Sequence, residues 1–574
     1  MSSTTSYLSS FLSNPKFTYD LVVGATAKSI NESLKIFLTK NAPPIKEVWY
    51  GQEKAGGPIT PMSPIPGVDP FAISSTEKPP ETVLSSPFAF AIKAGFGLPA
   101  NLKSSDLPDI LVLGTNSQKV IYNMFFNTFQ IATLDWGSRG SYAWKNYSQP
   151  ADKPFIFTYE VDMNFNSADP NDKFSSLPKE IQEQLQNYNT DIMFSVQQLY
   201  LDLNNAGLQS MPQIGDVQSN SPVYEKLLLD FIYTYWQSIS QSGQFIMGYA
   251  VHSNSGTPIR TSLEPTSLNF IVSPYYEDDG SISKKNQLYT LNYLMDTESR
   301  KLSVGGPFTW NWVSESEQNP LPGKTAVHGA MAVRREVFAN YLNAAISPYL
   351  ASIAITPTTT YQQSEAGFRW SAGYSLARTP NQSFTYSSTP GSRIADYTFS
   401  AFSYHSDTSG LISGHYNLDS VASASIDIAG KEITITLSAS MSIDFSNGDL
   451  GTADVSGSVG GYSNTIILVV DVNPDGSITV TNKPGYPTPT IIPASLQSGF
   501  MSGVDGVDGL TGSLTSNYTT MTEYMKNFAS QVAAYLNNSG TKWIFPGGQT
   551  FVFKKVGFSA NQDLVAHLVY LEPT

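Results

Sequence analysis

The chain has 574 residues, a formal net charge of −14 and no cysteine. The acidic excess argues against nucleic-acid binding, which needs a concentrated basic surface, and the lack of cysteine excludes disulfides, thiolate metal sites and cysteine nucleophiles. No basic segment followed by an apolar one opens the chain, and no apolar run approaches the about 18 residues of a membrane-spanning helix. The sequence therefore predicts a soluble protein made in the cytoplasm, with non-classical release left open.

The N-terminal part is expected to contain one short helix followed mainly by β-strands. A strand beginning at Phe17 precedes a helical stripe of apolar residues that ends near Thr39. The segment Leu177–Gly207 is predicted to be helical, in one or two pieces. The strands predicted between these helices are Phe88–Ala94, Ile121–Asp135 and Phe155–Phe165.

Two further helices and two strands are predicted in the middle of the chain. Ser221-Pro222 is a typical helix start, and apolar residues at helical spacing continue it from Val223 to Ile239. The second helix spans Val333–Ala345, and Pro348 is expected to disturb its end. The two strands are Ser267–Pro274 and Gln287–Leu294.

The C-terminal part, from Tyr361 onward, is rich in predicted strands and low in charge. A last amphipathic helix is predicted from Thr520 to Leu536, where Thr520 and Glu523 have capping-box spacing. The strands expected after it are Trp543–Phe553 and Asp563–Leu571.

The segment Ile433–Phe445 shows the clearest periodicity in the chain. At about 3.3 Å per residue it would span about 43 Å, well beyond a usual strand. Strict alternation of this kind predicts a strand with one apolar and one polar face. The apolar face carries Ile433, Ile435, Leu437, Ala439, Met441, Ile443 and Phe445, and the polar face carries Thr434, Thr436, Ser438, Ser440, Ser442 and Asp444.

These elements together predict an α+β fold of long curved antiparallel sheets wrapped around long amphipathic helices, with an elongated shape. Strands and helices do not alternate steadily, as they would in a parallel sheet. Three segments are expected: a β-rich lobe at 1–215, a helical and mixed segment at 216–350, and a second β-rich lobe at 351–574.

No catalytic or metal-binding motif is present. His405 and His415 lack metal-ligand spacing, and His567 lies in an apolar strand, which favours a core position. Gly323-Lys-Thr lacks the first glycine and the preceding strand of a phosphate-binding loop. The calcium-loop-like segment that begins at Asp471 lacks its closing acidic residue, since Asn482 stands there. We therefore expect no enzyme activity, cofactor or metal.

The segment Tyr19–Asn41 resembles the opening of the clostridial P-47 family, in which an aromatic-Asp pair precedes a short strand, a small-residue turn and a helix. Asp20, Asn31 and Leu34 are the matched positions, while Tyr19 stands where the family usually has Trp. The resemblance implies a tubular lipid-binding (TULIP-like) fold, in which a long helix lies in the groove of a strongly curved antiparallel sheet and leaves an apolar tunnel for a lipid tail. Proteins of this family accompany toxin gene clusters and look like lipid or phosphoinositide binders.

The apolar face of the long strand and the last predicted helix are the candidate ligand-binding surfaces. Methionine side chains adapt to varied apolar partners, so they suit a pocket wall, although a dry core uses the same residues. The partner expected is a lipid or another apolar small molecule, with transient membrane contact left open. The candidate residues are Ile433, Leu437, Met441, Phe445, Met521, Met525 and Phe528.

Two alternatives to lipid binding remain at this point. Long strands that alternate serine and threonine with apolar residues also suit the membrane hairpins of a β-pore-forming or insecticidal toxin, where about 9–11 residues cross the bilayer. The 12% aromatic residues would also suit an extracellular carbohydrate-active or structural β-protein, against which the missing signal peptide weighs.

Overall fold

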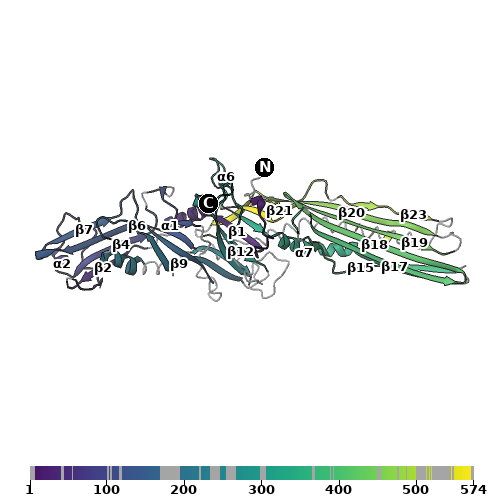
Figure 1. Ribbon diagram of the computed structural model, residues 1–574, viewed down its shortest axis with the longest axis horizontal. Helices are drawn as coiled ribbons and strands as arrows, with labels where there is room; N and C mark the ends of the chain where they lie inside the picture. Colours follow the sequence, from purple (N-terminus) through teal and green to yellow (C-terminus); the bar gives the residue numbers. More distant parts are fainter. Residues whose placement is uncertain are drawn as a thin grey trace.

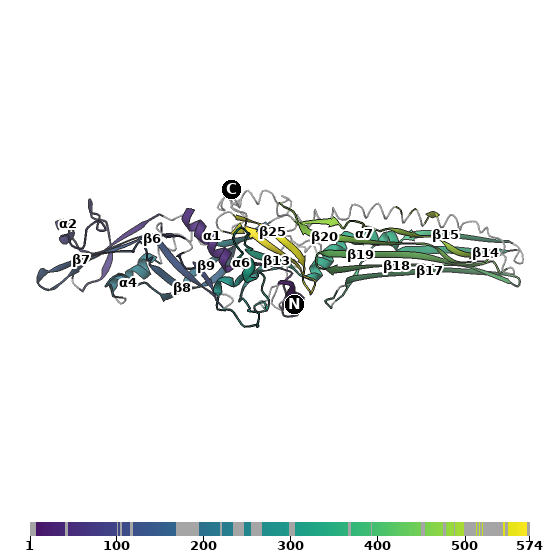
Figure 2. The ribbon, with the colours of Figure 1, turned by 90° about the horizontal axis from the view of Figure 1, so that it is seen from above.

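The protein is elongated, with β-rich ends on either side of a mixed centre (Figures 1 and 2). The fold comes from a computed structural model. Strands β1 and β26, from opposite ends of the chain, both pair with β13, which lies between them in the sheet. The structure describes residues 7–40, 44–54, 56–99, 102–103, 106–114, 119–167, 194–218, 221–232, 246–253, 267–297, 305–364, 369–387, 389–391, 393–448, 454–474, 478–486, 488–498, 512–513, 516, 519, 544–545 and 549–570.

A large antiparallel sheet runs through the centre and the N-terminal end. Its order among the described strands is β11-β12-β1-β13-β26-β25-β24-β10-β9-β8-β6-β4-β2-β3, with β5 and β7 also paired to β6. The central strands are β1 (Leu21–Thr26), β11 (Ser267–Ser273), β12 (Thr290–Asp296), β13 (Gly329–Val333), β24 (Ile544–Phe545), β25 (Gln549–Phe558) and β26 (Leu564–Tyr570). The others are β2 (Lys46–Gln52), β3 (Ile59–Met62), β4 (Phe88–Phe96), β5 (Leu111–Leu113), β6 (Lys119–Trp136), β7 (Tyr142–Ser148), β8 (Ile156–Ser167), β9 (Phe194–Ser210) and β10 (Ile246–Ser253).

The central strands β1, β12 and β13 are buried on both faces. One face contributes Val23, Tyr293 and Met331 to the main core, which continues into both ends of the molecule. The other face packs against a separate aromatic cluster that contains Phe17, Tyr19, Phe308, Trp310 and Trp312. A strand with two buried faces has no polar side, so its sequence shows an apolar run instead of alternation.

The residues matched to the P-47 opening hold helix α1 (Ala27–Lys40) and β1 in place. Asn31 Nδ2 donates to the Leu111 carbonyl at 2.8 Å, and Leu111 N donates back to Asn31 Oδ1 at 2.8 Å. Asp20 Oδ2 accepts from the backbone and hydroxyl of Thr297, and Leu34 packs in the main core. Their roles in this structure are therefore structural, since each joins segments distant in sequence.

A second antiparallel sheet forms the C-terminal end. Its order is β16-β17-β18-β19-β20-β21, with β22 and β23 also paired to β20. The hairpin β14–β15 packs on it, and Thr359 Oγ1 on β14 donates to the Tyr416 carbonyl on β18. The bounds are β14 (Ile355–Ser364), β15 (Arg369–Arg378), β16 (Thr385–Tyr386), β17 (Arg393–Ser409), β18 (Ile412–Ala429), β19 (Glu432–Ser446), β20 (Val455–Val472), β21 (Ile478–Asn482), β22 (Thr490–Ile492) and β23 (Ser495–Ser498).

The long strand predicted at Ile433–Phe445 is confirmed as β19. It pairs with β18 along its whole length, from Ala429↔Glu432 to His415↔Ser446, and with β20 on its other side. Its seven apolar residues are all buried, and the polar residues between them are half-buried or exposed. Antiparallel pairing of one-sided strands joins their apolar faces into one continuous surface.

The helices differ from the prediction in length and position. Helix α7 (Arg335–Ile353) continues past Pro348, where an end was expected, because Ile346, Leu350 and Ile353 remain buried in the main core. The predicted helix at 223–239 begins as α4 (Pro222–Lys226) and continues as the π-helix η5 (Leu227–Ile232); its remainder lies outside the described residues. The other short helices are η1 (Tyr7–Ser9), α2 (Glu81–Leu84), η3 (Ser138–Gly140), η6 (Asn286–Leu288) and α6 (Glu315–Gln318).

The helix predicted at Leu177–Gly207 is wrong where the structure describes that segment. Residues from Phe194 onward form β9, which pairs with β8 on one side and β10 on the other. Leu199, Leu201 and Leu203 alternate with other residues, and this period-two pattern suits a strand once partners exist on both sides. Tertiary pairing thus decides the structure of a sequence that is ambiguous by itself.

The antiparallel sheets and the elongated shape agree with the predicted fold class, whereas a long helix wrapped by a curved sheet is not seen in the described residues. The predicted helix Thr520–Leu536 lies outside them. No helix in the described ranges is long and apolar enough to span a membrane. The division at residues 215 and 350 stays a prediction, and the large sheet draws strands from all three of those segments.

Candidate functional site

Four of the predicted ligand-binding residues lie together on the inner face, by which we mean the buried face of β18, β19 and β20. Ile433, Leu437, Met441 and Phe445 follow one another along β19 and are 0–1% exposed. They are therefore sealed by packing, and a ligand could reach them only if that packing opened. The other three predicted residues, Met521, Met525 and Phe528, lie outside the described part of the chain.

The middle of the inner face carries small side chains, which we call the central recess. Ala422 on β18 lies opposite Ala439 on β19, and the next pair along is Ser420 with Met441. The members Ser420, Ala422, Ala424 and Ala439 are each 4–5% exposed, whereas Ile433, Ile435 and Leu437 are 0% exposed. Small residues in the middle of a sheet face leave room there for a bulkier group on whatever packs against it.

Aromatic side chains close the inner face at its outer end. The Phe445 ring lies 5.1 Å from Trp370, 5.6 Å from Tyr416 and 5.9 Å from Tyr361, measured between ring centroids. Tyr361 donates its hydroxyl to Gln363, and Gln363 Nε2 donates to the Asn447 carbonyl. These contacts tie hairpin β14–β15 to the end of β19, so the recess is bounded by large side chains on this side.

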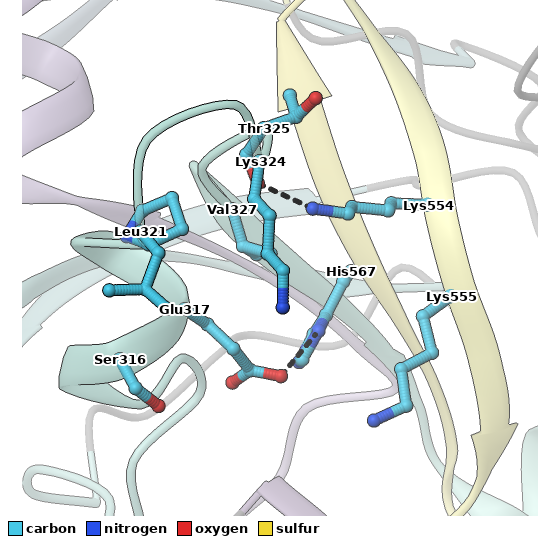
Figure 3. Close-up of a pocket in the computed structure, with 10 residues that line it drawn as sticks. Ser316, Glu317, Leu321, Lys324, Thr325, Val327, Lys554, Lys555 and His567 are labelled. Atoms are coloured by element: carbon cyan, nitrogen blue, oxygen red, sulfur yellow. Dashed lines mark hydrogen bonds and ion pairs between the residues drawn. The ribbon is translucent and has the colours of Figure 1, made fainter.

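A second candidate site is a pocket of about 490 Å³ at the centre of the molecule, which we call the lysine pocket (Figure 3). It lies between hairpin β25–β26 and the segment that links α6 to β13. Figure 3 shows lysines from both sides around it, with the Lys324 side chain extending over its middle. Its lining residues are Ser316, Glu317, Pro320, Leu321, Lys324, Thr325, Val327, Lys554, Lys555 and His567.

A β-bulge in β25 brings two consecutive lysines to this pocket. Phe553 pairs with Leu568 and Lys555 pairs with His567, so Lys554 is the extra residue. Successive side chains of a regular strand point to opposite faces, and a bulge redirects them. Lys554 Nζ donates to the Thr325 carbonyl, and Lys555 Nζ lies 5.0 Å from the centre of the Tyr7 ring.

The opposite wall is a turn whose conformation follows from its sequence. In Leu321-Pro322-Gly323-Lys324, the Lys324 backbone N–H donates to the Leu321 carbonyl at 3.1 Å. Gly323 has a φ of +84°, which suits the third position of a type II turn after proline. This turn carries Lys324 and leaves Leu321 73% exposed, so it presents a cation and an apolar side chain together.

Glu317 and His567 face each other in the pocket, with His567 Nδ1 3.6 Å from Glu317 Oε1. Burial lowers the pKa of His567 to about 4, and the charges of Lys555 and Lys554 lower it further, while the attraction of Glu317 opposes the shift. The imidazole is therefore neutral at pH 7. The pKa of Glu317 is lowered. Burial acts to raise it, but the positive charge that His567 gains in acid, two hydrogen bonds from Ser314 and the charge of Lys555 together outweigh burial. Glu317 therefore keeps its negative charge.

These residues can bind an anion, but they do not form a nucleophile–base pair. The Ser316 hydroxyl pairs with that of Ser314 at 3.2 Å and not with His567. Within the described ranges, no group of three or more His, Asp or Glu residues is placed to hold a metal ion. Asp471, in the rejected calcium-loop motif, forms an ion pair with Lys431 at 2.8 Å.

The sequence did not identify the lysine pocket. His567 was expected to be a core residue, and it is 1% exposed, yet its ring also lines the pocket. The available signal was the pair Lys554-Lys555 inside an otherwise apolar strand, where alternation would leave one ammonium on a buried face. The bulge that resolves this conflict depends on pairing with β26, which the sequence does not reveal.

Comparisons with known proteins give structural neighbours but no sequence relative. No protein-family model and no curated protein matches the chain. Its fold is similar to P47 from Clostridium botulinum A2 (11% identity, 97% of this chain and 99% of that chain, TM-score 0.40). It is also similar to P47 of Clostridium botulinum E1 (10%, 96% and 98%, 0.40) and to a lipopolysaccharide binding protein (8%, 97% and 99%, 0.28). The P-47 family that the N-terminal segment resembles is thus found among the structural neighbours. Similarities with TM-scores this low do not assign a function, which is argued below from the residues of this chain.

Proposed function

We propose that this protein binds a lipid or another apolar ligand, without catalysis, along the inner face of the C-terminal sheet. The observation that carries the proposal is the central recess, where the small side chains Ser420, Ala422, Ala424 and Ala439 occupy the middle of a long, buried apolar face. Larger side chains bound the recess, with Ile435 toward the centre of the molecule and Phe445 at the outer end. An extended acyl chain has the shape and the chemistry to fill such a groove.

The energy available from this surface is sufficient for tight binding. Burying about ten methylene groups at about 0.8 kcal/mol each contributes about 8 kcal/mol. That corresponds to a dissociation constant of about 1 µM, before the cost of displacing the residues that now cover the recess. Met441, at the edge of the recess, can change its rotamer to accommodate chains of different shape.

In this proposal the ligand reaches the inner face when its cover opens, because Ile433 and Leu437 are sealed in the structure as it stands. Met521, Met525 and Phe528, the predicted residues that lie outside the described ranges, stay candidate ligand contacts in this proposal. An adaptable side chain such as Met441 would favour a ligand class defined by apolar surface more than by a fixed shape.

Filling the recess tests the proposal. Native mass spectrometry of the purified protein, followed by solvent extraction, should detect a bound lipid or apolar molecule. Ala439→Leu adds a side chain in the recess and should remove this adduct, at a stability cost of about 1–3 kcal/mol. Thr436→Leu makes a comparable change on the exposed face of the same strand and should keep the adduct. If no apolar molecule is bound, and none can be loaded from detergent-dispersed lipid, the proposal is wrong.

A membrane-active toxin is a second candidate, because the β17–β18 hairpin presents apolar side chains to solvent. Leu411 at its turn is fully exposed, and Phe402 and Tyr404 stand out from the outer face of β17. Dye release from phosphatidylcholine vesicles separates the two functions. A lipid binder should take up lipid without leakage, whereas leakage that is lost in Leu411→Asp would favour the toxin.

A further inference from the structure

We propose that the lysine pocket is a second binding site, for the phosphate monoester group of an organic ligand. This site is independent of the inner face and goes beyond the proposed function. The geometry that carries it is the convergence of Lys324, Lys554 and Lys555, from two unconnected segments, on one pocket with an apolar wall (Figure 3).

The charge of the pocket is opposite to that of the whole chain. Three lysines surround Glu317 as the single carboxylate among the lining residues, which leaves two net positive charges in a protein whose net charge is −14. A phosphate monoester carries about 1.5 to 2 negative charges at pH 7, so it matches this excess. Lysine is well suited to the role because its ammonium binds phosphate as a point charge.

The backbone is arranged to bring these charges together, although they repel one another. Without the bulge in β25, Lys554 and Lys555 would point to opposite faces of the strand. Their present partners are a carbonyl oxygen for Lys554, and an aromatic ring and the Glu317 charge for Lys555. The Lys324 ammonium has no ion-pair or hydrogen-bond partner within the described residues. A bound phosphate would neutralise this repulsion.

The size and the apolar wall indicate that the ligand is larger than phosphate alone. The volume of about 490 Å³ falls in the range of small-molecule sites. Leu321 stands exposed at the rim beside Pro320, and Val327 lines the wall. An organic phosphate could place its apolar part against these side chains and its charged group among the lysines. The source could be a small phosphate ester or a lipid headgroup with the same terminal phosphate.

Isothermal titration calorimetry with octyl phosphate, below its micelle concentration, tests the site on the full chain. Octyl phosphate should bind, and inorganic phosphate should compete with it at millimolar concentration. Lys324→Ala changes an exposed turn residue, so folding should be retained, and it should weaken binding by about tenfold or more. The matched control Lys284→Ala removes the same charge from an exposed position elsewhere and should change affinity by less than about twofold.

Vesicles distinguish the two sources. Co-sedimentation with phosphatidylcholine vesicles containing phosphatidic acid, lost in Lys324→Ala, would identify a lipid headgroup, whereas binding of octyl phosphate alone would identify a small phosphate ester. Either result supports the site. It is overturned if neither probe binds, or if both bind equally to the wild-type protein and Lys324→Ala. Its failure would leave the adduct test at Ala439 unaffected, so the two proposals can fail separately.

Discussion

The C-terminal sheet and the central strands bury apolar residues in different ways. β19 alternates between a sealed inner face and an outer face in contact with water, whereas β1, β12 and β13 are buried on both faces. On β12, Tyr293 and Met295 point into the main core and Leu294 points into the aromatic cluster. The alternation of apolar and polar residues therefore shows which side of a strand is buried only where the other side is exposed to solvent.

The largest effects should come from β12, because neither of its faces tolerates truncation. Leu294→Ala and Met295→Ala remove neighbouring side chains that are both 0% exposed but lie in different cores. Each should lower the free energy of unfolding by about 2–5 kcal/mol. Urea unfolding followed by tryptophan fluorescence would measure both, since Trp310 and Trp312 lie in the aromatic cluster. A cost below about 1 kcal/mol for either variant would contradict the two-core arrangement.

On β19, truncating an inner-face residue and truncating an outer-face residue should lower the free energy of unfolding by different amounts. Leu437→Ala, on the inner face, should cost about 2–5 kcal/mol, and Thr436→Ala, on the outer face, about 0.5 kcal/mol or less. Thermal unfolding of both variants under one set of conditions is the measurement. Equal costs at the two positions would show that the outer face is also covered, and the comparison between the regions would fail.

Acid should weaken the central region, because His567 and His328 are held neutral there, each with its pKa lowered to about 4 by burial. A lowered folded pKa gives stability that is present above the usual value of 6.5 and is lost as the pH falls toward 4. Between pH 7 and pH 5, His567 alone should account for a loss of about 2 kcal/mol. Unfolding at the two pH values should show a smaller difference in His567→Gln.

Asp563 acts in the opposite direction in the same region. Burial raises its pKa to about 6, although hydrogen bonds from Leu12, Ser10 and Arg335 oppose the shift. Its contribution is therefore present below about pH 4 and is lost as the pH rises through 6, and it should offset about 1 kcal/mol of the acid loss. Asp563→Asn should make the decline between pH 7 and pH 5 steeper. A decline unchanged in both variants would contradict the assigned burial effects.

A smaller effect than at the buried positions should come from the turn between β18 and β19, which contacts β25. Gly430, between β18 and β19, has a φ of +61° and accepts a hydrogen bond from Phe558 N on β25 at 2.6 Å. Nothing lies within 4 Å of a side chain added there, so Gly430→Ala should cost only the conformational strain, about 1 kcal/mol. A thermal scan would measure it, with Gly391→Ala, an open glycine without a positive φ, as control.

The sequence predicted β19 almost to the residue because Thr436, Ser442 and Asp444 face water between buried neighbours. It failed at β9, where Leu199 and Leu201 suit either structure and pairing with β8 and β10 decides. It failed again at α7, where burial of Leu350 and Ile353 outweighs the proline at position 348.

Of the two candidate sites, the sequence predicted part of the inner face but not the lysine pocket. The residues predicted on β19 share one face, as alternation requires, but the recess beside them depends on Ala422, which only the register with β18 places opposite Ala439. The lysine pocket was missed, because its charges come from residues more than two hundred positions apart and from a bulge set by β26. Local periodicity therefore predicts which residues of one strand share a face, whereas the register between strands determines which residues come together in a site.

Photolabelling with a long-chain fatty acid that carries a diazirine tests the central claim most directly. After irradiation, peptide mass spectrometry should locate the label on inner-face residues of β18 to β20, near Ala439 and Met441. The labelling should be lost in Ala439→Leu and kept in Thr436→Leu. Label confined to the exposed side chains Phe402, Tyr404 or Leu321, with none on the inner face, would contradict the account.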